Sequence, residues 1–277
     1  FRVTAASPTM WWLERHSRGF DDTITDTSET TAALAIQGPT SRAALEAATD
    51  SALEMRFFGI APARIAAVDV EISRTGYTGD LGYELWVDPA LAETLWDQLF
   101  EAGRDYMIRP MGSAALDIIR IEAGFIMAWE DFVPAEQVVR HGRARSPFEL
   151  GLSWLVDFNK PHFTGRKALL QEKEHGSRYR FVKLDVEGNK PAEHSFILNK
   201  AEEVVGHVTS AAWCPTAKSN IALASMNMPW GQESDELYAE IYYNRELHWT
   251  RLLAPCKVMT GPIYEPERRR MTPAPNF

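Results

Sequence analysis

The sequence predicts an α+β fold in which an α/β sandwich is followed by a small C-terminal β-barrel of the jelly-roll kind. Between residues 31 and 124, strand-like segments alternate with amphipathic helical ones, which is typical of helices on one face of an antiparallel sheet. From Tyr179 onward the apolar period shifts toward two, and Gly, Asn and Pro separate short segments. The chain has 277 residues, 45% of them hydrophobic, so it can bury more than one core.

The charge balance excludes several classes of function. The formal net charge is −9, whereas nucleic acids and membrane surfaces are bound by clustered positive charge. One basic cluster, residues 268–270, lies among prolines, and we expect it to be a solvated tail. No apolar run approaches the roughly 18 residues of a membrane helix, and residues 1–4 resemble neither a signal nor a transit peptide. We expect neither a nucleic acid nor a membrane as a partner.

Cysteine and histidine usage predicts a protein without a structural metal. The two cysteines, Cys214 and Cys256, form no disulfide framework and no Cys-x-x-Cys pair, and no two of the seven histidines have the spacing of a helical zinc motif. So few cysteines fit a reducing compartment. The predicted location is the cytoplasm.

The N-terminal region is predicted to begin with a strand over residues 1–6. Ser7, followed by a proline, can then cap a helix that carries Trp11 and Trp12. Two adjacent residues cannot face the same side of a helix. We therefore expect one of the two tryptophans in the core, while the other can line a ligand pocket.

The rest of the sandwich is predicted from capping residues and apolar spacing. Each predicted helix begins at a favoured cap, and the last one ends at Gly124. The predicted elements are a strand at 31–36, a helix from 40 through 45, a strand at 65–72, a helix from 88 through 99 and a helix from 112 through 123.

The second half is predicted to contain a connecting segment and a barrel. Residues 134–147 are predicted to form a polar loop, 150–157 a strand and 166–174 a helix that His175 and Gly176 terminate. The predicted barrel strands lie at 181–184, 196–198, 204–208, 221–224, 237–242 and 249–252. The resulting domain boundaries are 1–150 for the sandwich, 151–178 for the connection and 179–277 for the barrel.

The stretch from Ser73 to Glu84 is the most informative part of the chain. Its glycines, at positions 76, 79 and 82, permit a tight turn and a close approach of the backbone to a bound ring. Tyr77 can stack on a flat heterocycle, and the Glu84 carboxylate can accept two parallel hydrogen bonds from an amino-pyrimidine edge. The alternative is a hairpin in which the glycines serve the turn alone, and their spacing does not decide between the two.

Five motifs give the chain a resemblance to a known family. Residues 75–84 read Thr-Gly-Tyr-Thr-Gly-Asp-Leu-Gly-Tyr-Glu, and they resemble the signature of the aminomethyltransferase (glycine-cleavage T-protein) family. Those proteins bind tetrahydrofolate and include several folate-dependent demethylases. Four further segments resemble motifs of the same family in the same order: 35–39 (Ala-Ile-Gln-Gly-Pro), 119–124 (Ile-Arg-Ile-Glu-Ala-Gly), 163–169 (Phe-Thr-Gly-Arg-Lys-Ala-Leu) and 206–210 (Gly-His-Val-Thr-Ser).

The resemblance implies a folate-binding sandwich domain over residues 1–150 and tetrahydrofolate as the cofactor. It implies that Tyr77 and Glu84 contact the folate. Trp154 and Tyr264 can contact it as well, and the alternatives for them are core packing for Trp154 and surface packing for Tyr264. The family's catalytic aspartate lies in a segment that we expect upstream of Phe1. The first domain therefore looks N-terminally incomplete, and no catalytic residue is identified within the sequence.

Departures from the family pattern concern the substrate. Many T-proteins have an asparagine where this chain has an alanine or Ser7, and an arginine where it has Leu116. Met127-Ala128-Trp129 replaces a Leu-Tyr-Gly triplet, and a tryptophan face can hold a methylated cation or an aromatic ring. We expect Ser7, Trp12 and Trp129 to contact the substrate.

The expected activity is transfer of a methyl group from a small O-, S- or N-methylated substrate to N5 of tetrahydrofolate. One alternative is the T-protein reaction, which uses a lipoyl carrier protein as partner. Another is a non-catalytic folate-binding assembly or regulatory protein. Members of that kind carry Lys-Gly-Cys-x-x-Gly-Gln-Glu where this chain has residues 162–167, which contain no cysteine. An inactive remnant is a further alternative.

Overall fold

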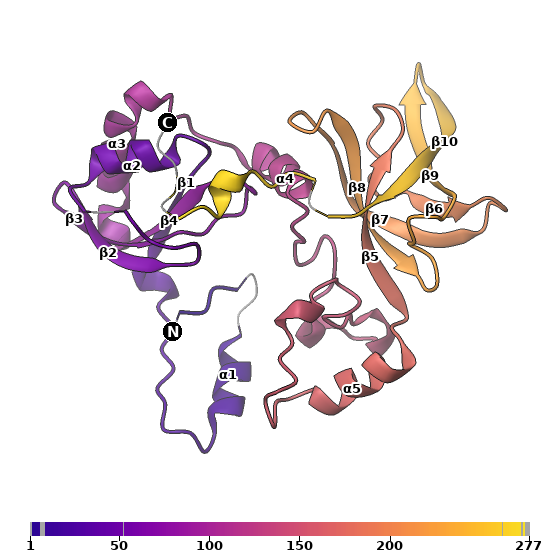
Figure 1. The fold of residues 1–277 in the computed structure, drawn as a ribbon, viewed down its shortest axis with the longest axis horizontal. Helices are drawn as coiled ribbons and strands as arrows, with labels where there is room; N and C mark the ends of the chain where they lie inside the picture. Colours follow the sequence, from indigo (N-terminus) through magenta and orange to yellow (C-terminus); the bar gives the residue numbers. More distant parts are fainter. Residues whose placement is uncertain (1, 6–8, 52, 262, 273, 275–277) are drawn as a thin grey trace. The chain divides into compact units, whose positions relative to one another are not determined.

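A computed structural model describes residues 2–5, 9–51, 53–261, 263–272 and 274 (Figure 1). The chain divides into two compact units. Unit 1 comprises Phe1–Met111 and Pro266–Phe277, and unit 2 comprises Gly112–Glu265. These units divide the chain at different residues from the predicted regions 1–150, 151–178 and 179–277, which stay a prediction.

Unit 1 is a four-stranded antiparallel sheet with helices on one face, as predicted (Figure 1). The strand order is β1-β4-β3-β2. Its elements are α1 (Met10–Ser17), β1 (Ala32–Gln37), α2 (Ser41–Ala48), β2 (Ile60–Ile65), β3 (Val68–Ser73), β4 (Gly82–Val87) and α3 (Ala92–Ala102). Short 3₁₀ turns lie at Ser28–Thr30, Pro89–Leu91, Arg104–Tyr106 and Glu267–Arg269.

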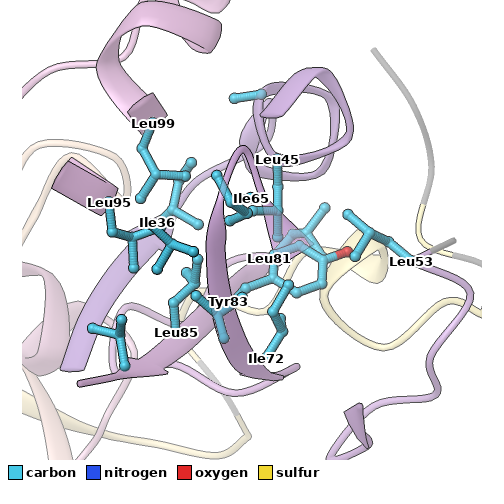
Figure 2. Packing of buried hydrophobic residues seen from close by; sticks show 14 of the residues in the cluster. Ile36, Leu45, Leu53, Ile65, Ile72, Leu81, Tyr83, Leu85, Leu95 and Leu99 are labelled. Atoms are coloured by element: carbon cyan, nitrogen blue, oxygen red, sulfur yellow. The ribbon is translucent and has the colours of Figure 1, made fainter. Parts of the chain in front are cut away.

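The core of unit 1 lies between this sheet and the helices α2 and α3. Alternate residues of β4, such as Tyr83 and Leu85, point into it and are fully buried, as period-two side-chain alternation requires. Leu45 of α2 and Leu95 of α3 cover them (Figure 2). Glu84, between Tyr83 and Leu85, therefore projects from the opposite face of the sheet.

The N-terminal region differs from the prediction. Residues 2–5 form no strand, and no residue of α1 is buried. Trp11 is 49% exposed and Trp12 is 43% exposed, so the expectation that one of them joins the core is wrong. Their rings pack on each other instead, edge to face, with centroids 5.5 Å apart. Ser7, predicted as a cap and a substrate contact, lies outside the described residues.

The residues predicted as one strand, 65–72, instead span the end of β2, a two-residue turn and most of β3. β2 and β3 pair in register, with Ile65 opposite Val68, and the turn passes through Ala66 and Ala67. Ala66 adopts a left-handed backbone with φ 53°. Two-residue hairpin turns usually have Gly or Asn in that conformation, and these residues make such turns recognisable in a sequence. Alanine gives no such signal, which is why the sequence pattern missed the turn.

Unit 2 contains a closed six-stranded barrel, which confirms the predicted C-terminal barrel (Figure 1). Its strand order is β10-β5-β8-β7-β6-β9. The elements of unit 2 are α4 (Ser113–Glu122), α5 (Arg166–His175), β5 (Tyr179–Val186), β6 (Phe196–Asn199), β7 (Val204–Cys214), β8 (Ser219–Asn227), β9 (Leu237–Arg245) and β10 (His248–Met259). Further 3₁₀ turns lie at Ala135–Gln137, His141–Arg143 and Ser153–Leu155. Within the described ranges, none of the helices has both the length and the apolar character needed to cross a bilayer.

The segment at 150–157 is not the predicted strand. It is a run of turns that includes the 3₁₀ turn Ser153–Leu155, and Trp154 is 74% exposed. Leu150, at the start of the segment, is buried, but the tryptophan that follows it is exposed. The segment has the apolar composition of a strand, but it pairs with no other strand in the described part of the chain.

Helix α4 packs on the barrel wall through its apolar side. Ile121 joins a buried cluster with Cys214, Ile221 and Leu223, which come from β7 and β8. Burial raises the pKa of both Cys214 and Cys256 to about 12. Both thiols therefore stay protonated at neutral pH, and neither can act as a nucleophile.

A buried charge network fixes α4 to the barrel. Arg120, with 2% of its side chain exposed, donates to Asp117 at 2.7 Å, to Asp131 at 2.6 Å and to the Ser210 hydroxyl of β7 at 2.7 Å. The fully buried Asp131 carboxylate also accepts from Thr209 and Ser210. From the sequence, Arg120 is expected either to form an ion pair with Glu122 or to reach an anionic ligand. The ion pair with Glu122 is wrong, because Glu122 accepts from the backbone of Ala217 at 2.6 Å. Arg120 is committed to this network, which removes the alternative that it reaches an anionic ligand.

The C-terminal segment also differs from the prediction. We call residues 266–272 and 274 the C-terminal strap. Arg268 forms a two-point ion pair with Asp80 at 2.6 and 2.7 Å, and the guanidinium groups of Arg269 and Arg270 lie over the Phe57 ring. The expected solvated tail is therefore a packed part of unit 1.

We predict that Arg120→Ala lowers the free energy of unfolding by about 3–5 kcal/mol, because it leaves the Asp131 carboxylate buried without its counter-charge. Urea denaturation followed by circular dichroism measures this change. Lys200→Ala is the control, since its ion pair with Glu236 is largely exposed, and we expect it to change stability by no more than about 0.5 kcal/mol. Equal effects of the two substitutions would show that the Arg120 network is not stabilising.

Candidate functional site

The glycine turn, residues 74–81, joins β3 to β4 and rests on the side chain of Gln37. The carboxamide nitrogen of Gln37 donates to the backbone carbonyls of Thr75 at 3.3 Å and Tyr83 at 3.1 Å. Its carboxamide oxygen accepts from the Thr78 hydroxyl at 3.1 Å. A single side chain at the end of β1 thus bonds both ends and the middle of this segment.

Two of the glycines leave the space that the Gln37 side chain occupies. A Cβ atom added at Gly76 or at Gly82 would overlap the carboxamide of Gln37. Gly79 is the only one of the three with a left-handed backbone, at φ 75°. Gly76 and Gly82 thus allow a close approach to Gln37. The predicted approach of these glycines to a bound ring stays a prediction.

Glu84 lies on β4, directly opposite Ala35 of β1 and Ser73 of β3. Its side chain is half-buried, and its Oε2 accepts from the hydroxyls of Thr75 and, at 3.5 Å, Ser73. Among the described residues, Oε1 accepts no hydrogen bond. An ionised carboxylate has about four acceptor positions. Glu84 is thus oriented by its neighbours while one oxygen is available to an external donor.

The sheet face around Glu84 combines polar and aromatic groups. The indole nitrogen of Trp86 donates to Ser73 at 3.3 Å, and the Arg2 guanidinium lies 4.7 Å from the Trp86 ring centroid. Arg2 also pairs with Glu71. Ala35, opposite Glu84, presents only a methyl group. Such a face can hold a flat ligand that has hydrogen-bond donors along one edge.

The other predicted residues of unit 1 have different surroundings. Tyr77 is half-buried within the glycine turn, between the two ends that Gln37 holds. Trp12 is on α1, where its ring stacks on His16 with centroids 4.0 Å apart. Of the residues predicted in unit 1, Tyr77 therefore lies in the glycine turn and Glu84 on β4, the strand that follows it.

Trp129, in unit 2, has a strained backbone. Its φ is 76°, and its amide donates to the Phe132 carbonyl at 2.7 Å in a tight loop. Bulky residues rarely adopt this left-handed conformation, whereas glycine adopts it freely. This explains the glycine in the Leu-Tyr-Gly triplet that residues 127–129 replace. The indole is 53% exposed, so packing does not compensate for the strain.

The remaining predicted contacts are also in unit 2. Trp154 is largely exposed, which rules out the alternative that it packs in the core. Tyr264 is half-buried in the segment after β10. Nothing in the geometry assigns either of them to a folate.

Sequence reasoning missed two groups with functional potential. One is Gln37, which lies in the family motif at 35–39. The glycines at positions 76 and 82 could have indicated that a side chain packs against them. Lys183 of β5 gave no signal. Its ammonium donates to the Gly261 carbonyl at 2.6 Å, and burial lowers its pKa, opposed by the charge of Glu265. Within the described residues, no three His, Cys, Asp or Glu side chains come together as a metal site.

Two family models match most of the chain. The GCVT N-terminal domain matches residues 2–160, and the glycine cleavage T-protein C-terminal barrel domain matches residues 179–264. The first match alone spans more than half of the 277 residues.

Curated relatives and a solved structure agree with these matches. An aminomethyltransferase of Caldanaerobacter subterraneus is 33% identical over 82% of this chain and 59% of its own length, and one of Thermotoga maritima is 36% identical over 77% and 56%. A trimethylamine-oxide aldolase of Ruegeria pomeroyi is 40% identical over 70% of this chain and 25% of its own length. The crystal structure of aminomethyltransferase T from Bartonella henselae superposes with a TM-score of 0.76 at 26% identity, covering 92% of this chain and 65% of that one.

The chain thus spans less than two thirds of the length of these relatives. The motifs, the sandwich, the barrel and both family models nevertheless agree along it. The chain belongs to the glycine cleavage T-protein family.

Proposed function

We propose that this protein is a tetrahydrofolate-dependent one-carbon transferase and that it takes a methyl group from a small N-methylated substrate. Family membership supports the class of reaction. The single observation that carries the folate assignment is the Glu84 carboxylate, which is held by Thr75 and Ser73 with Oε1 open to a donor.

Glu84 on β4 and Tyr77 in the glycine turn fit a reduced pterin. Its amino-pyrimidine edge carries adjacent N–H donors, which match a fixed, half-buried carboxylate acceptor. Tetrahydrofolate, when bound, supplies the nucleophilic nitrogen N5 that accepts the one-carbon unit. Glu84 would orient that ring system by its edge, and Tyr77 would pack beside it. Because transfer of a methyl group needs the reacting atoms in line, such orientation is the main contribution of these residues.

Trp129 supports an N-methylated substrate. The left-handed backbone of Trp129 reduces stability, and its half-exposed indole does not offset this cost by packing. Strained residues of this kind cluster at ligand sites. An indole face attracts methylated cations. The aldolase relative, 40% identical, is named for trimethylamine oxide, which is an N-methylated compound. The indole face thus favours a cationic methyl donor over a neutral O-methyl compound, and the name of this relative favours an N-methyl donor over an S-methyl one.

Two alternatives remain in competition with this proposal. The aminomethyltransferase relatives favour the T-protein reaction, with a lipoyl carrier protein as partner. A folate-binding protein without turnover is the other. Ser7 and Trp12 as substrate contacts, Trp154 and Tyr264 as folate contacts, and the cytoplasmic location are still proposals. No catalytic residue is assigned.

Mass spectrometry of the folate product tests the proposal. The purified chain is incubated with tetrahydrofolate and one candidate substrate at a time. The candidates, tested in parallel reactions, are trimethylamine N-oxide, an N-methylated amino acid, an aryl methyl ether, a methyl sulfonium compound and an aminomethylated lipoyl carrier protein. We expect 5-methyltetrahydrofolate from an N-methylated compound. Formation of methylenetetrahydrofolate from the carrier protein would support the T-protein reaction instead, and calorimetric binding without any product would support the non-catalytic alternative.

Glu84→Ala should weaken tetrahydrofolate binding by about 1–3 kcal/mol, because the buried donors of the ligand lose their acceptor. Isothermal titration calorimetry measures the change. Asp69→Ala serves as the control, since it removes an exposed carboxylate from the neighbouring strand β3. An unchanged affinity in Glu84→Ala, with normal circular dichroism, would remove Glu84 from the folate site.

Trp129→Gly should raise the KM for the methylated substrate while the Kd for tetrahydrofolate stays constant. Glycine relieves the left-handed backbone, so stability should stay within about 1 kcal/mol of the parent. The control is Trp249→Ala, which removes another exposed tryptophan, on β10. If both constants are unaltered in Trp129→Gly, the indole does not contact the substrate.

A further inference from the structure

Both ends of the glycine turn are held by the C-terminal strap. The turn begins at Arg74, directly after β3, and Asp80 lies near its other end, two residues before β4. Each of these side chains bonds to strap residues almost two hundred positions later in the sequence. Tyr77 lies between the two attachment points, and Glu84 follows the second.

The first attachment is made by a buried cation. Arg74 is 1% exposed, and its guanidinium donates to the carbonyls of Arg268 at 3.4 Å, Arg269 at 3.1 Å and Met271. It also donates to the Met55 carbonyl at 3.0 Å. No carboxylate of the described residues forms an ion pair with it, and burial lowers its pKa. Strap carbonyls therefore supply most of the partners that a buried charge requires.

The second attachment is an ion pair with two parallel hydrogen bonds. Nε and Nη2 of Arg268 donate to the two oxygens of Asp80, and both side chains are mostly buried. Paired donors of this kind fix orientation as well as distance. Asp80 Oδ1 also accepts from the Leu81 amide at 2.6 Å, which transmits the constraint to the start of β4.

The strap is itself anchored in unit 1. Ala274 is 2% exposed and belongs to the same core cluster as Tyr83, and its carbonyl accepts from Arg42 of α2. Two buried atoms beside the strap, Nε of Arg74 and the hydroxyl of Tyr83, have no hydrogen-bond partner among the described residues. Unsatisfied buried polar atoms offset part of the gain from docking.

We propose that the C-terminal strap is a latch that holds the glycine turn in its ligand-binding geometry, with Arg74, Asp80 and Arg268 as positioning residues for Tyr77 and Glu84. This inference rests on the proposed folate site. Gln37 supports the turn from the sheet side, and the strap supplies the second constraint. Release of the strap frees the turn and lowers affinity for the reduced pterin.

Arg268→Ala tests the latch in the full chain. We expect the Kd for tetrahydrofolate to rise about tenfold, which corresponds to the loss of one buried hydrogen-bonded contact. Hydrogen exchange measured by mass spectrometry should accelerate in residues 74–84 while the barrel strands keep their protection. Arg268→Lys keeps the charge but not the paired donors, so its Kd should lie between those of the parent and Arg268→Ala. Arg64→Ala, which removes an exposed arginine of β2 in the same unit, is the matched control and should bind like the parent.

The outcomes separate the latch from the folate assignment. If the parent binds tetrahydrofolate and Arg268→Ala binds it equally well, the latch is wrong while the folate site stands. If the parent does not bind tetrahydrofolate, the folate site is wrong. Exchange then decides the latch alone, since unaltered protection of residues 74–84 in Arg268→Ala overturns it. General unfolding of Arg268→Ala would appear as faster exchange in every strand of unit 1, and Arg268→Lys then provides the test.

Discussion

The carboxamide of Gln37 is the contact on which the candidate site depends. It replaces the backbone ladder where β3 and β4 separate, and it satisfies two carbonyls and one hydroxyl of the irregular segment between them. An irregular loop needs such partners because buried backbone groups without them are costly. Gly76 and Gly82 are the complement of this side chain, since any Cβ there would displace it. On the sheet side, the turn is thus held by one glutamine that two glycines admit.

Much of the fold could be predicted from local patterns. The helices at 113–122 and 166–175 followed from caps and terminating glycines, and the barrel followed from short alternating strands. The misses share a physical cause. Ala66 forms a hairpin turn without the usual residue, and the apolar run at 150–157 pairs with no strand. In both cases the backbone conformation is set by neighbours in space, which a local pattern does not contain.

The site was predictable only in part for the same reason. Sequence motifs placed Tyr77 and Glu84 in the stretch 73–84, which the structure shows as a turn followed by the start of β4, and their contact with a folate stays a prediction. The partners of the buried charges were beyond the reach of a local pattern. Arg120 pairs with Asp117 and Asp131 and not with Glu122. Arg74 bonds to backbone carbonyls almost two hundred positions away, which no residue letter reveals. Contacts set by the tertiary fold decide these positions, and one sequence does not show them.

Unit 1 is discontinuous, because the whole of unit 2 lies between Met111 and Pro266. A ribosome that makes this chain synthesises the barrel strands before Ala274, which belongs to the first core. Unit 1 is therefore begun before unit 2 and completed after it, and Arg74 has no carbonyl partners from the strap until residues 268–271 have been made. Folding of the two units during translation thus overlaps in time, because the core of the sandwich is completed only by a residue that follows the whole barrel in the sequence.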